Sequence, residues 1–384
     1  MSETSRQFSI LIPILGFARS GGDRVLSKLA DQWIAQQCRV SFLVPCWSEL
    51  PYFPTNAEVH WVDGWGREVG HRSNKPPPST TLGKILRFFS TLLGLLRGIS
   101  KVGGPWDVVI ANQSMTAWPV ALGHTNASKV YYIQAYEPEH YHKKGLGILL
   151  LKGLSWMSYF LPLHRIANAP LYLCYRSCRA SCWIPPGLDL ENFHPRLEGG
   201  RLPQDQERPG LIVGCIGRPE PHKGTRQAIE AYRAFTSRVP GQHRFRLSNF
   251  GVPPEWLEGI PGLELVFPGN DGELADYYRS IEVLLALCTI EHGAHHYPVL
   301  EAMASGVLVI TTGYTPADSS NAWIVGPDPL DAAAALVKIS VEVETTERKR
   351  EHALAAIRAY DWPNVGADFL KELHALREGK GHAQ

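Results

Sequence analysis

Residues 291–306 read EHGAHHYPVLEAMASG and lie between two apolar runs, Val283–Leu287 and Val307–Ile310. Apolar runs of this length are typical of buried strands, and the stretch between them is polar at its start and helical in pattern at its end. We therefore expect a strand, a polar loop, a short helix and a second strand. This order is typical of an open, mostly parallel α/β sheet.

The expected short helix has the features of an anion site. Pro298 suits its first position, Glu301 falls in its first turn, and Gly306 suits the position just past its end. A polar loop at the carboxyl end of a strand directs the backbone N–H groups of such a helix toward an anion. Because a carboxylate accepts hydrogen bonds, Glu301 could also bind a sugar hydroxyl.

The alternation of strands and helices extends over two halves of the chain. In the first half the expected elements are the strands Phe8–Leu15, Val40–Val44, Val59–Val62, Trp106–Ala111 and Lys129–Gln134, with a helix over Asp23–Gln37. A polar segment, Pro195–Gly210, predicts a linker. After it we expect the strands Leu211–Gly217, Phe245–Phe250 and Leu263–Phe267 and the helices Thr225–Phe235 and Leu274–Ser280. Two doubly wound domains follow, with ligands expected at the carboxyl ends of their strands and a cleft between them.

Composition fits two ordinary domains. The chain has 384 residues, 44% apolar and 20% charged, and its formal net charge of +1 gives no reason to expect a nucleic-acid partner. The start lacks the pattern of a signal peptide, and seven cysteines without an export signal fit a reducing cytoplasm. Cys174, Cys178 and Cys182 could share one helix face. They match no common zinc pattern, so small buried side chains are the preferred interpretation over a metal site.

Two basic residues, Arg218 and Lys223, lie between an expected strand end and a helix start in GRPEPHKGT. Thr225 is a candidate N-cap of that helix. Cations beside the first amides of a helix suit a diphosphate, because the charges and the N–H groups act together. The alternative is a solvated loop with two ordinary charges.

Gly21 and Gly22 stand where the first strand turns into a helix. Glycines there allow a phosphate or sugar to approach the backbone, although a pair of glycines is also common in tight turns. The G-x-G-x-x-G spacing is absent, which argues against a dinucleotide oxidoreductase.

Five motifs, in order along nearly the whole chain, resemble the GT-B glycosyltransferases of family 4, which are retaining and use sugar nucleotides. They are SGGDRVLSKLADQWIAQQCRVSFLVP, IPPGLDLENFHP, GRPEPHKG, YPVLEAMASG and DWPNVGADFLKELHAL. The resemblance implies a GT-B fold of two Rossmann-like domains, at 1–195 and 209–360, with a closing helix at 361–384. It implies no cofactor and no metal.

Carried over to this sequence, the resemblance gives residues with expected roles. Arg218 and Lys223 would hold the donor diphosphate, Glu301 the ribose, and the backbone at Val299 and Leu300 the phosphates. The full set of expected donor-binding residues is Gly21, Gly22, Gly217, Glu291, His295, His296, Tyr297, Val299, Leu300 and Glu301.

One position departs from the family pattern. Many members have a glutamate eight residues before the second glutamate of the donor helix, where this chain has Gly293. Either this glutamate is replaced by one of the nearby residues Glu291, His292, His295 and His296, or the sugar is recognised differently. Three histidines also allow a metal site, but polar lining of a sugar pocket is the preferred interpretation.

A further likeness concerns YYIQAYEPEHYH, which resembles the Q-x-Y/F-E-P stretch of family 4 rhamnosyltransferases, as Tyr297–Glu301 resembles their donor helix. We expect Gln134, Tyr136 and His140 on the acceptor side, and Glu137 as a catalytic polar group. The alternative is that Glu137 and His140 only cap local structure.

Residues 81–101 and 146–163 are apolar segments edged by cations. The first predicts either a helix at the surface of a membrane or a core-facing helix of the first domain. Membrane contact would place the protein in the cytoplasm at the inner face of the cell membrane.

The leading hypothesis is a retaining glycosyltransferase that moves a sugar, plausibly from deoxythymidine-diphosphate rhamnose, to a saccharide or lipid-linked saccharide in surface polysaccharide synthesis. A UDP- or GDP-sugar is an alternative donor. Because of Gly293, a catalytically silent GT-B binding or scaffold protein is the alternative from another class.

Overall fold

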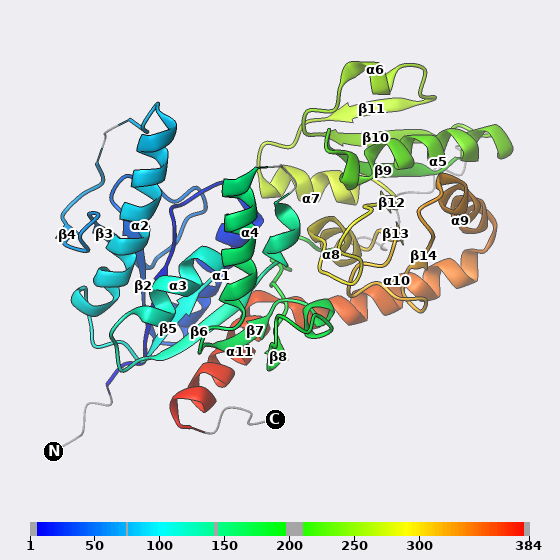
Figure 1. Ribbon diagram of the computed structural model, residues 1–384. Coiled ribbons are helices and arrows are strands. Elements are labelled where there is room, and N and C mark those ends of the chain that lie inside the picture. Colours follow the sequence, from blue (N-terminus) through cyan, green and yellow to red (C-terminus); the bar gives the residue numbers. More distant parts are fainter. Residues whose placement is uncertain (1–5, 74–75, 142–144, 197–209, 380–384) are drawn as a thin grey trace. The chain divides into compact units, whose positions relative to one another are not determined.

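The computed structural model describes residues 6–73, 76–141, 145–196 and 210–379 (Figure 1). The chain forms two compact units: unit 1 is Met1–Gly187 with Trp362–Gln384, and unit 2 is Leu188–Asp361. Each unit is built on one sheet of parallel strands with helices between them. The predicted fold class, α/β with two doubly wound sheets, is confirmed.

The sheet of unit 1 has the strand order β4-β3-β2-β1-β5-β6-β7-β8. All neighbours are parallel except β3 and β4. All five residues of β1 are buried, as expected for a strand covered by helices on both faces. The strands are β1 (Ser9–Pro13), β2 (Arg39–Pro45), β3 (Glu58–Val62), β4 (Glu68–Val69), β5 (Val108–Ala111), β6 (Ser128–Ile133), β7 (His164–Ala167) and β8 (Cys182–Trp183).

The helices of unit 1 form two groups. α1 contacts α11, where the rings of Trp33 and Phe369 lie 5.2 Å apart, whereas α3 contacts both α2 and α4. Because the crossovers β1–α1–β2 and β5–α3–β6 run in opposite directions, right-handed connections place α1 and α3 on opposite faces. The switch point lies between β1 and β5. The helices are α1 (Gly21–Ala35), α2 (Thr81–Lys101), α3 (Ser114–Leu122), η1 (Glu137–His140), α4 (Leu146–Ser158), η2 (Pro170–Leu173) and α11 (Trp362–Arg377).

The sheet of unit 2 is parallel throughout, with the order β11-β10-β9-β12-β13-β14. Its switch point lies between β9 and β12, where a doubly wound sheet is expected to bind its ligand. The strands are β9 (Ile212–Gly217), β10 (Arg244–Asn249), β11 (Leu263–Val266), β12 (Val283–Ala286), β13 (Leu308–Thr311) and β14 (Trp323–Ile324). The helices are η3 (Pro221–Lys223), α5 (Thr225–Arg238), α6 (Pro254–Leu257), α7 (Asp271–Arg279), α8 (Tyr297–Ala304), α9 (Pro329–Val341), α10 (Val343–Ile357) and η4 (Arg358–Tyr360).

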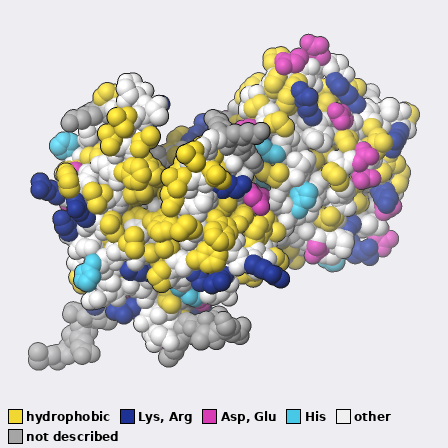
Figure 2. Space-filling view, in the orientation of Figure 1, with side chains coloured by type: hydrophobic (Ala, Val, Ile, Leu, Met, Phe, Trp, Pro, Cys, Tyr) yellow, Lys and Arg dark blue, Asp and Glu magenta, His cyan; other side chains and the backbone are white. Residues whose placement is uncertain are grey.

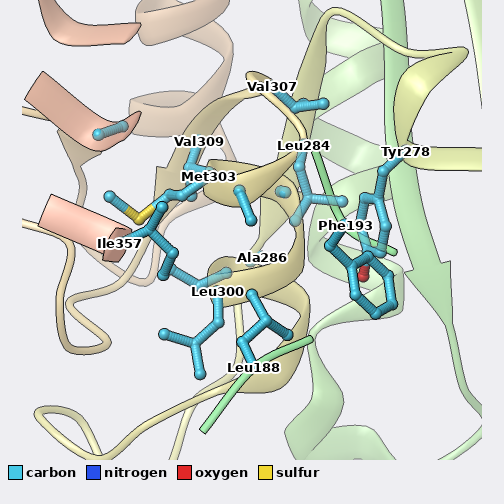
Figure 3. Packing of buried hydrophobic residues seen from close by; sticks show 14 of the residues in the cluster. Leu188, Phe193, Tyr278, Leu284, Ala286, Leu300, Met303, Val307, Val309 and Ile357 are labelled. Carbon is cyan, nitrogen blue, oxygen red and sulfur yellow. The ribbon is translucent and has the colours of Figure 1, made fainter. Parts of the chain in front are cut away.

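The short helix α8 is at the centre of a buried cluster in unit 2 (Figure 3). Leu300 and Met303 pack there with Leu284 of β12 and Val309 of β13. Every residue from Val299 to Ala304 is buried. Packing on all sides fixes α8 in place and therefore fixes its first residues beside the switch point.

The ends of α8 match the sequence prediction in part. Gly306 has φ +74° and follows the C-cap, as predicted, with its N–H donating to Met303 O. The helix begins at Tyr297, so Pro298 is its second residue, and Glu301 falls in the second turn rather than the first.

The first boundary between the units differs from the expected residue 195. Leu188 and Phe193 are buried in the cluster of unit 2, and Leu188 N donates to Tyr360 O. The chain therefore enters unit 2 at Leu188 because these side chains complete its core. Residues 197–209 of the predicted linker lie outside the described part of the chain.

The three cysteines expected on one helix face do not share a helix. Cys174 follows η2 and Cys182 belongs to β8. Cys182 lies instead beside His164 and Glu372, and the ligand atoms of these three residues are within 4.8 Å of one another. His164 Nε2 and Glu372 Oε1 are 2.9 Å apart, so this group connects α11 to the sheet of unit 1.

Candidate functional site

The loop after β9 carries Arg218 at the switch point of unit 2. Its backbone N–H donates to Thr225 Oγ1 at 2.9 Å, and the Thr225 hydroxyl donates to Arg218 O at 2.8 Å. The guanidinium of Arg218 lies 5.1 Å from the centroid of the Phe250 ring. Thr225 is thus the first residue of α5 and closes the loop, whereas the N-cap is Gly224, which corrects the prediction for Thr225.

Gly224 brings this loop against the end of β12. It has φ +76°, and a Cβ at this position would lie 2.1 Å from Leu287 O. Only glycine fits there without displacing the backbone. Two contacts join the same segments: Thr289 N donates to His222 O at 3.0 Å, and Cys288 Sγ lies 3.4 Å from Lys223 O.

His296, just before α8, lies near the loop that carries Arg218 and Lys223. Its Nε2 lies 3.3 Å from Cys288 Sγ, and its ring is 4.9 Å from that of Tyr314. Burial, together with the positive charges of Lys223 and Arg218, lowers the pKa of His296 to about 3. The ring is therefore neutral at physiological pH. Its Nδ1 is buried and has no hydrogen-bond partner within the described residues.

No carboxylate among the described residues forms an ion pair with Arg218 or Lys223. Arg218 is exposed and Lys223 is half-buried. Two cations next to a neutral histidine make this end of the sheet positive. It can therefore accept an anion at the place that the sequence predicted.

The backbone N–H groups at the start of α8 were expected to bind the donor phosphates, and the structure does not support that role. The N–H groups of Val299 and Leu300 both donate to His296 O, at 2.8 and 3.2 Å. Because both groups are engaged within the chain, the structure does not support phosphate contacts from them. The carboxylate of Glu301 is buried and accepts a hydrogen bond from Tyr278 Oη at 2.9 Å.

The loop that precedes α8 has a left-handed backbone at two positions. Glu291 has φ +52° and Gly293 has φ +92°. Gly293 N donates to Gly313 O at 2.7 Å, which holds the loop against the segment after β13. A side chain at residue 293 would be strained in this conformation. His295 Nε2 lies 3.2 Å from Tyr360 Oη.

In unit 1, Gly22 and Gln134 come together although they are far apart in sequence. Ser20 caps α1 by accepting from Asp23 N at 3.1 Å, so Gly21 and Gly22 are its first residues. A Cβ on Gly22 would lie 3.3 Å from Gln134 Oε1. Gly22 therefore leaves room for the Gln134 side chain beside the start of α1.

Glu137 lies in η1, and both of its carboxylate oxygens have partners. Ser114 N donates to Oε1 at 2.6 Å and Ser114 Oγ donates to Oε2 at 2.5 Å. Burial raises the pKa of Glu137, and the hydrogen bonds from Ser114 oppose that rise. The carboxylate thus anchors the first residue of α3. This geometry favours the capping alternative, and a role in chemistry stays a prediction.

Tyr136 belongs to a group of stacked rings. Its ring is 5.5 Å from Tyr159 and 4.4 Å from Tyr175, and Ser177 Oγ donates to its hydroxyl. His140 is exposed, and its charge lowers the pKa of Glu137. The acceptor-side role of both residues stays a prediction.

Sequence reasoning did not identify Cys288, Thr312 and Tyr314. The hydroxyl of Thr312 donates to Cys288 O, and that of Tyr314 donates to Ile290 O. They fix the loop that carries His296. Their position in the sequence could have identified them, since each lies after a strand whose carboxyl end is at the ligand-binding edge of the sheet.

The sequence of unit 2 matches a known family. Residues 210–341, which are about a third of the chain, match the family described as Glycosyl transferases group 1. No curated protein sequence matches the chain.

Solved structures share the fold over nearly all of the chain. The sucrose-phosphate synthase from Thermosynechococcus elongatus has a TM-score of 0.70 at 15% identity and covers 97% of this chain and 100% of its own. HepE of Anabaena, in complex with UDP and glucose, has a TM-score of 0.65 at 15% identity, covering 96% and 100%. The catalytic domain of Starch Synthase IV from Arabidopsis thaliana, bound to ADP and acarbose, has a TM-score of 0.66 at 14% identity, covering 97% and 99%.

These findings establish the fold of the chain. The chain has the GT-B fold, and its second unit carries the glycosyltransferase group 1 match. The finer predictions, family 4 and a likeness to rhamnosyltransferases, stay predictions.

Proposed function

We propose that the protein is a retaining glycosyltransferase of family 4 that takes a sugar from a nucleotide diphosphate. The observation that carries this proposal is a pair of cations, Arg218 and Lys223, that lie beside His296 at the switch point of unit 2 and have no carboxylate partner within the described part of the chain. A diphosphate is the anion that best fits two cations beside a helix start.

The chemistry follows from where charge develops. Glycosyl transfer passes through an oxocarbenium-like state while a nucleotide diphosphate leaves with increasing negative charge. Arg218 and Lys223 can stabilise that charge without any proton transfer. The neutral His296 offers hydrogen bonding to the diphosphate or sugar without adding a third charge to the loop.

We propose that Glu301 positions the ribose. Its carboxylate is held by Tyr278 Oη, so its orientation is fixed before a ligand arrives. A fixed acceptor loses less conformational freedom on binding, which favours affinity. Glu291, His295 and Tyr297 lie on the same loop and helix start, and we propose that they line the sugar pocket in place of the carboxylate absent at Gly293.

The donor and acceptor are proposed on less direct support. HepE of Anabaena was solved with UDP and glucose, and the starch synthase domain with ADP. A nucleotide-diphosphate sugar is therefore the proposed donor class, and deoxythymidine-diphosphate rhamnose a candidate within it because of the YYIQAYEP stretch. We propose that Gln134, Tyr136 and His140 face a saccharide or lipid-linked saccharide acceptor.

A donor panel tests this function. Release of nucleotide diphosphate should be measured with UDP-, GDP-, ADP- and deoxythymidine-diphosphate sugars in the wild type and in Arg218→Ala and Lys223→Ala. Each substitution should lower turnover about 10²–10³-fold, as the loss of an oxyanion donor does. Arg238→Ala, at the other end of α5, is the matched control and should retain full turnover.

The alternative is a GT-B protein that binds a nucleotide but does not transfer sugar. Two observations favour it: the absence of a carboxylate at Gly293, and the engagement of both Glu137 oxygens by Ser114. Tight nucleotide binding without turnover of any donor, in the same panel, would support this alternative and exclude the transferase.

A further inference from the structure

Helix α2 packs on unit 1 through the second half of its length, where Gly94, Leu95, Gly98 and Ile99 are buried. A Cβ on Gly94 would lie 2.5 Å from Asp63 O, and one on Gly98 would lie 3.1 Å from the Leu43 side chain. Close approach of the backbone is possible only because these residues are glycines. The helix therefore directs an apolar row outward, and 47–66% of each of these side chains is exposed: Leu82, Ile85, Leu86 and Phe89.

Helix α4 has the same arrangement. Among its residues the buried ones are Ser155 and Ser158, while large apolar side chains are exposed by 47–85%: Leu146, Leu149, Leu150, Trp156 and Met157. Because α3 contacts both α2 and α4, the two helices lie on the same side of the sheet. Hydrophobic side chains gather over this part of unit 1 in Figure 2. We call the exposed apolar side chains of α2 and α4 the apolar face.

The segment of chain that carries the apolar face has a strongly positive net charge. Residues 69–188 contain thirteen lysines and arginines but only three acidic residues, Asp107, Glu137 and Glu139, in a chain whose net charge is +1. Asp107 is held by Ser9, and Glu137 by Ser114. α2, α3 and α4 contain no acidic residue, and Lys84 and Lys152 are exposed on α2 and α4.

We propose that the apolar face docks on an anionic lipid surface. Apolar side chains edged by cations suit the boundary between headgroups and acyl chains, and lysines and arginines add attraction to anionic lipids. A second copy of the chain fits less well, because it would bring the same positive charge against itself. None of the described helices is long and apolar enough to cross a membrane.

This inference rests on the proposed function, since a surface-bound enzyme would meet a lipid-linked acceptor. It also explains why the apolar row in the first half of α2 stays exposed, while Thr91, Gly94, Leu95, Gly98 and Ile99 in its second half are buried. An apolar row directed outward lowers solubility unless something covers it.

Sedimentation with vesicles tests the proposal. The protein should bind vesicles that contain phosphatidylglycerol, and bind vesicles of phosphatidylcholine alone at least tenfold more weakly. L86E/F89E and L149E/L150E should each lower binding at least tenfold. Phe267→Glu is the matched control, because Phe267 is 67% exposed in unit 2, and it should bind as the wild type does.

A second variant, K84Q/K152Q, keeps the apolar side chains and should lose the preference for anionic vesicles. Circular dichroism should show that all variants melt as the wild type does, because the changed residues are exposed. The proposal would be overturned if L86E/F89E bound vesicles as strongly as the wild type does, or if the wild type bound both vesicle types equally. It would also be overturned if the wild type formed a dimer in solution and L86E/F89E were a monomer. Release of nucleotide diphosphate without vesicles reports on the proposed function separately.

Discussion

At the scale of single residues, the site of unit 2 depends on His296. Its ring lies between Cys288 and Tyr314, and its pKa is low because the ring is buried and also because Lys223 and Arg218 are positively charged. A bound diphosphate would neutralise those charges and so favour the protonated ring.

We predict that a nucleotide diphosphate raises the pKa of His296. The pKa should move upward from about 3 when UDP or another nucleotide diphosphate is added, and NMR titration of the ring protons measures it. The matching nucleoside, which has no phosphate, is the control and should leave the pKa unchanged. The same result for both ligands would contradict the proposed position of the diphosphate.

We also predict a change in the acid stability of the protein. The pKa of His296 is about 3 in the folded chain and 6.5 as the ordinary value, so between these pH values the unfolded chain binds a proton that the folded chain does not. The contribution of the neutral His296 ring to the free energy of unfolding is therefore fully present above pH 6.5 and is lost as the pH falls toward 3. Unfolding by urea should depend less on pH in this window for His296→Gln than for the wild type. Parallel curves for the two proteins would contradict the assigned shift.

Gly224 provides a backbone test. With φ +76° and a Cβ only 2.1 Å from Leu287 O, Gly224→Ala should displace the loop of Lys223. We expect lower nucleotide affinity and a loss of about 1–3 kcal/mol in the free energy of unfolding. Gly259→Ala is the control, because Gly259 has φ +65° but no atom within 4 Å of the added Cβ. Unchanged affinity in Gly224→Ala would argue that the loop does not hold the ligand.

At the scale of the elements, α11 belongs to unit 1 although it follows unit 2 in the chain. Phe369 is fully buried and contacts the rings of Trp33 and Tyr132, while Trp33 Nε1 donates to Gly366 O. The predicted closing helix therefore completes the core of the first unit.

Phe369→Ala should destabilise unit 1 by about 3–5 kcal/mol, the usual cost of removing a buried phenylalanine. Denaturation followed by tryptophan fluorescence measures it, since Trp33 reports on this contact. Phe267→Ala removes an exposed ring from unit 2 and should change the stability little. A small effect of Phe369→Ala would show that α11 is not anchored in solution.

The elements also show what the sequence could predict. Strands such as Val40–Val44 and Val283–Leu287 were predictable because buried parallel strands are continuous apolar runs. The orientation of α2 was not predictable, since apolar periodicity normally indicates the buried face, whereas Leu86 and Phe89 are exposed here and Gly94 and Gly98 are buried beside Leu95 and Ile99. The capping of α3 by Glu137 was also left open, because it joins residues 23 positions apart.

At the scale of the whole molecule, the fold and the positions of Arg218 and Lys223 could be predicted from the order of the motifs. The contacts of His296 with Cys288 and Tyr314 could not, because they depend on two loops, after β12 and after β13, that meet only after the sheet has formed. The boundary at Leu188 was missed for a similar reason, since Leu188 and Phe193 complete a core built by later strands.

The central claim is that Arg218 and Lys223 bind a diphosphate, and calorimetric titration with nucleotide diphosphates tests it most directly. The wild type should bind at least one of UDP, GDP, ADP and deoxythymidine diphosphate. Arg218→Ala and Lys223→Ala should each weaken that binding about 10–100-fold, as expected for a lost charge-assisted hydrogen bond of about 1.5–3 kcal/mol. Arg238→Ala should bind as the wild type does. Unchanged affinity in both cation variants would contradict the claim.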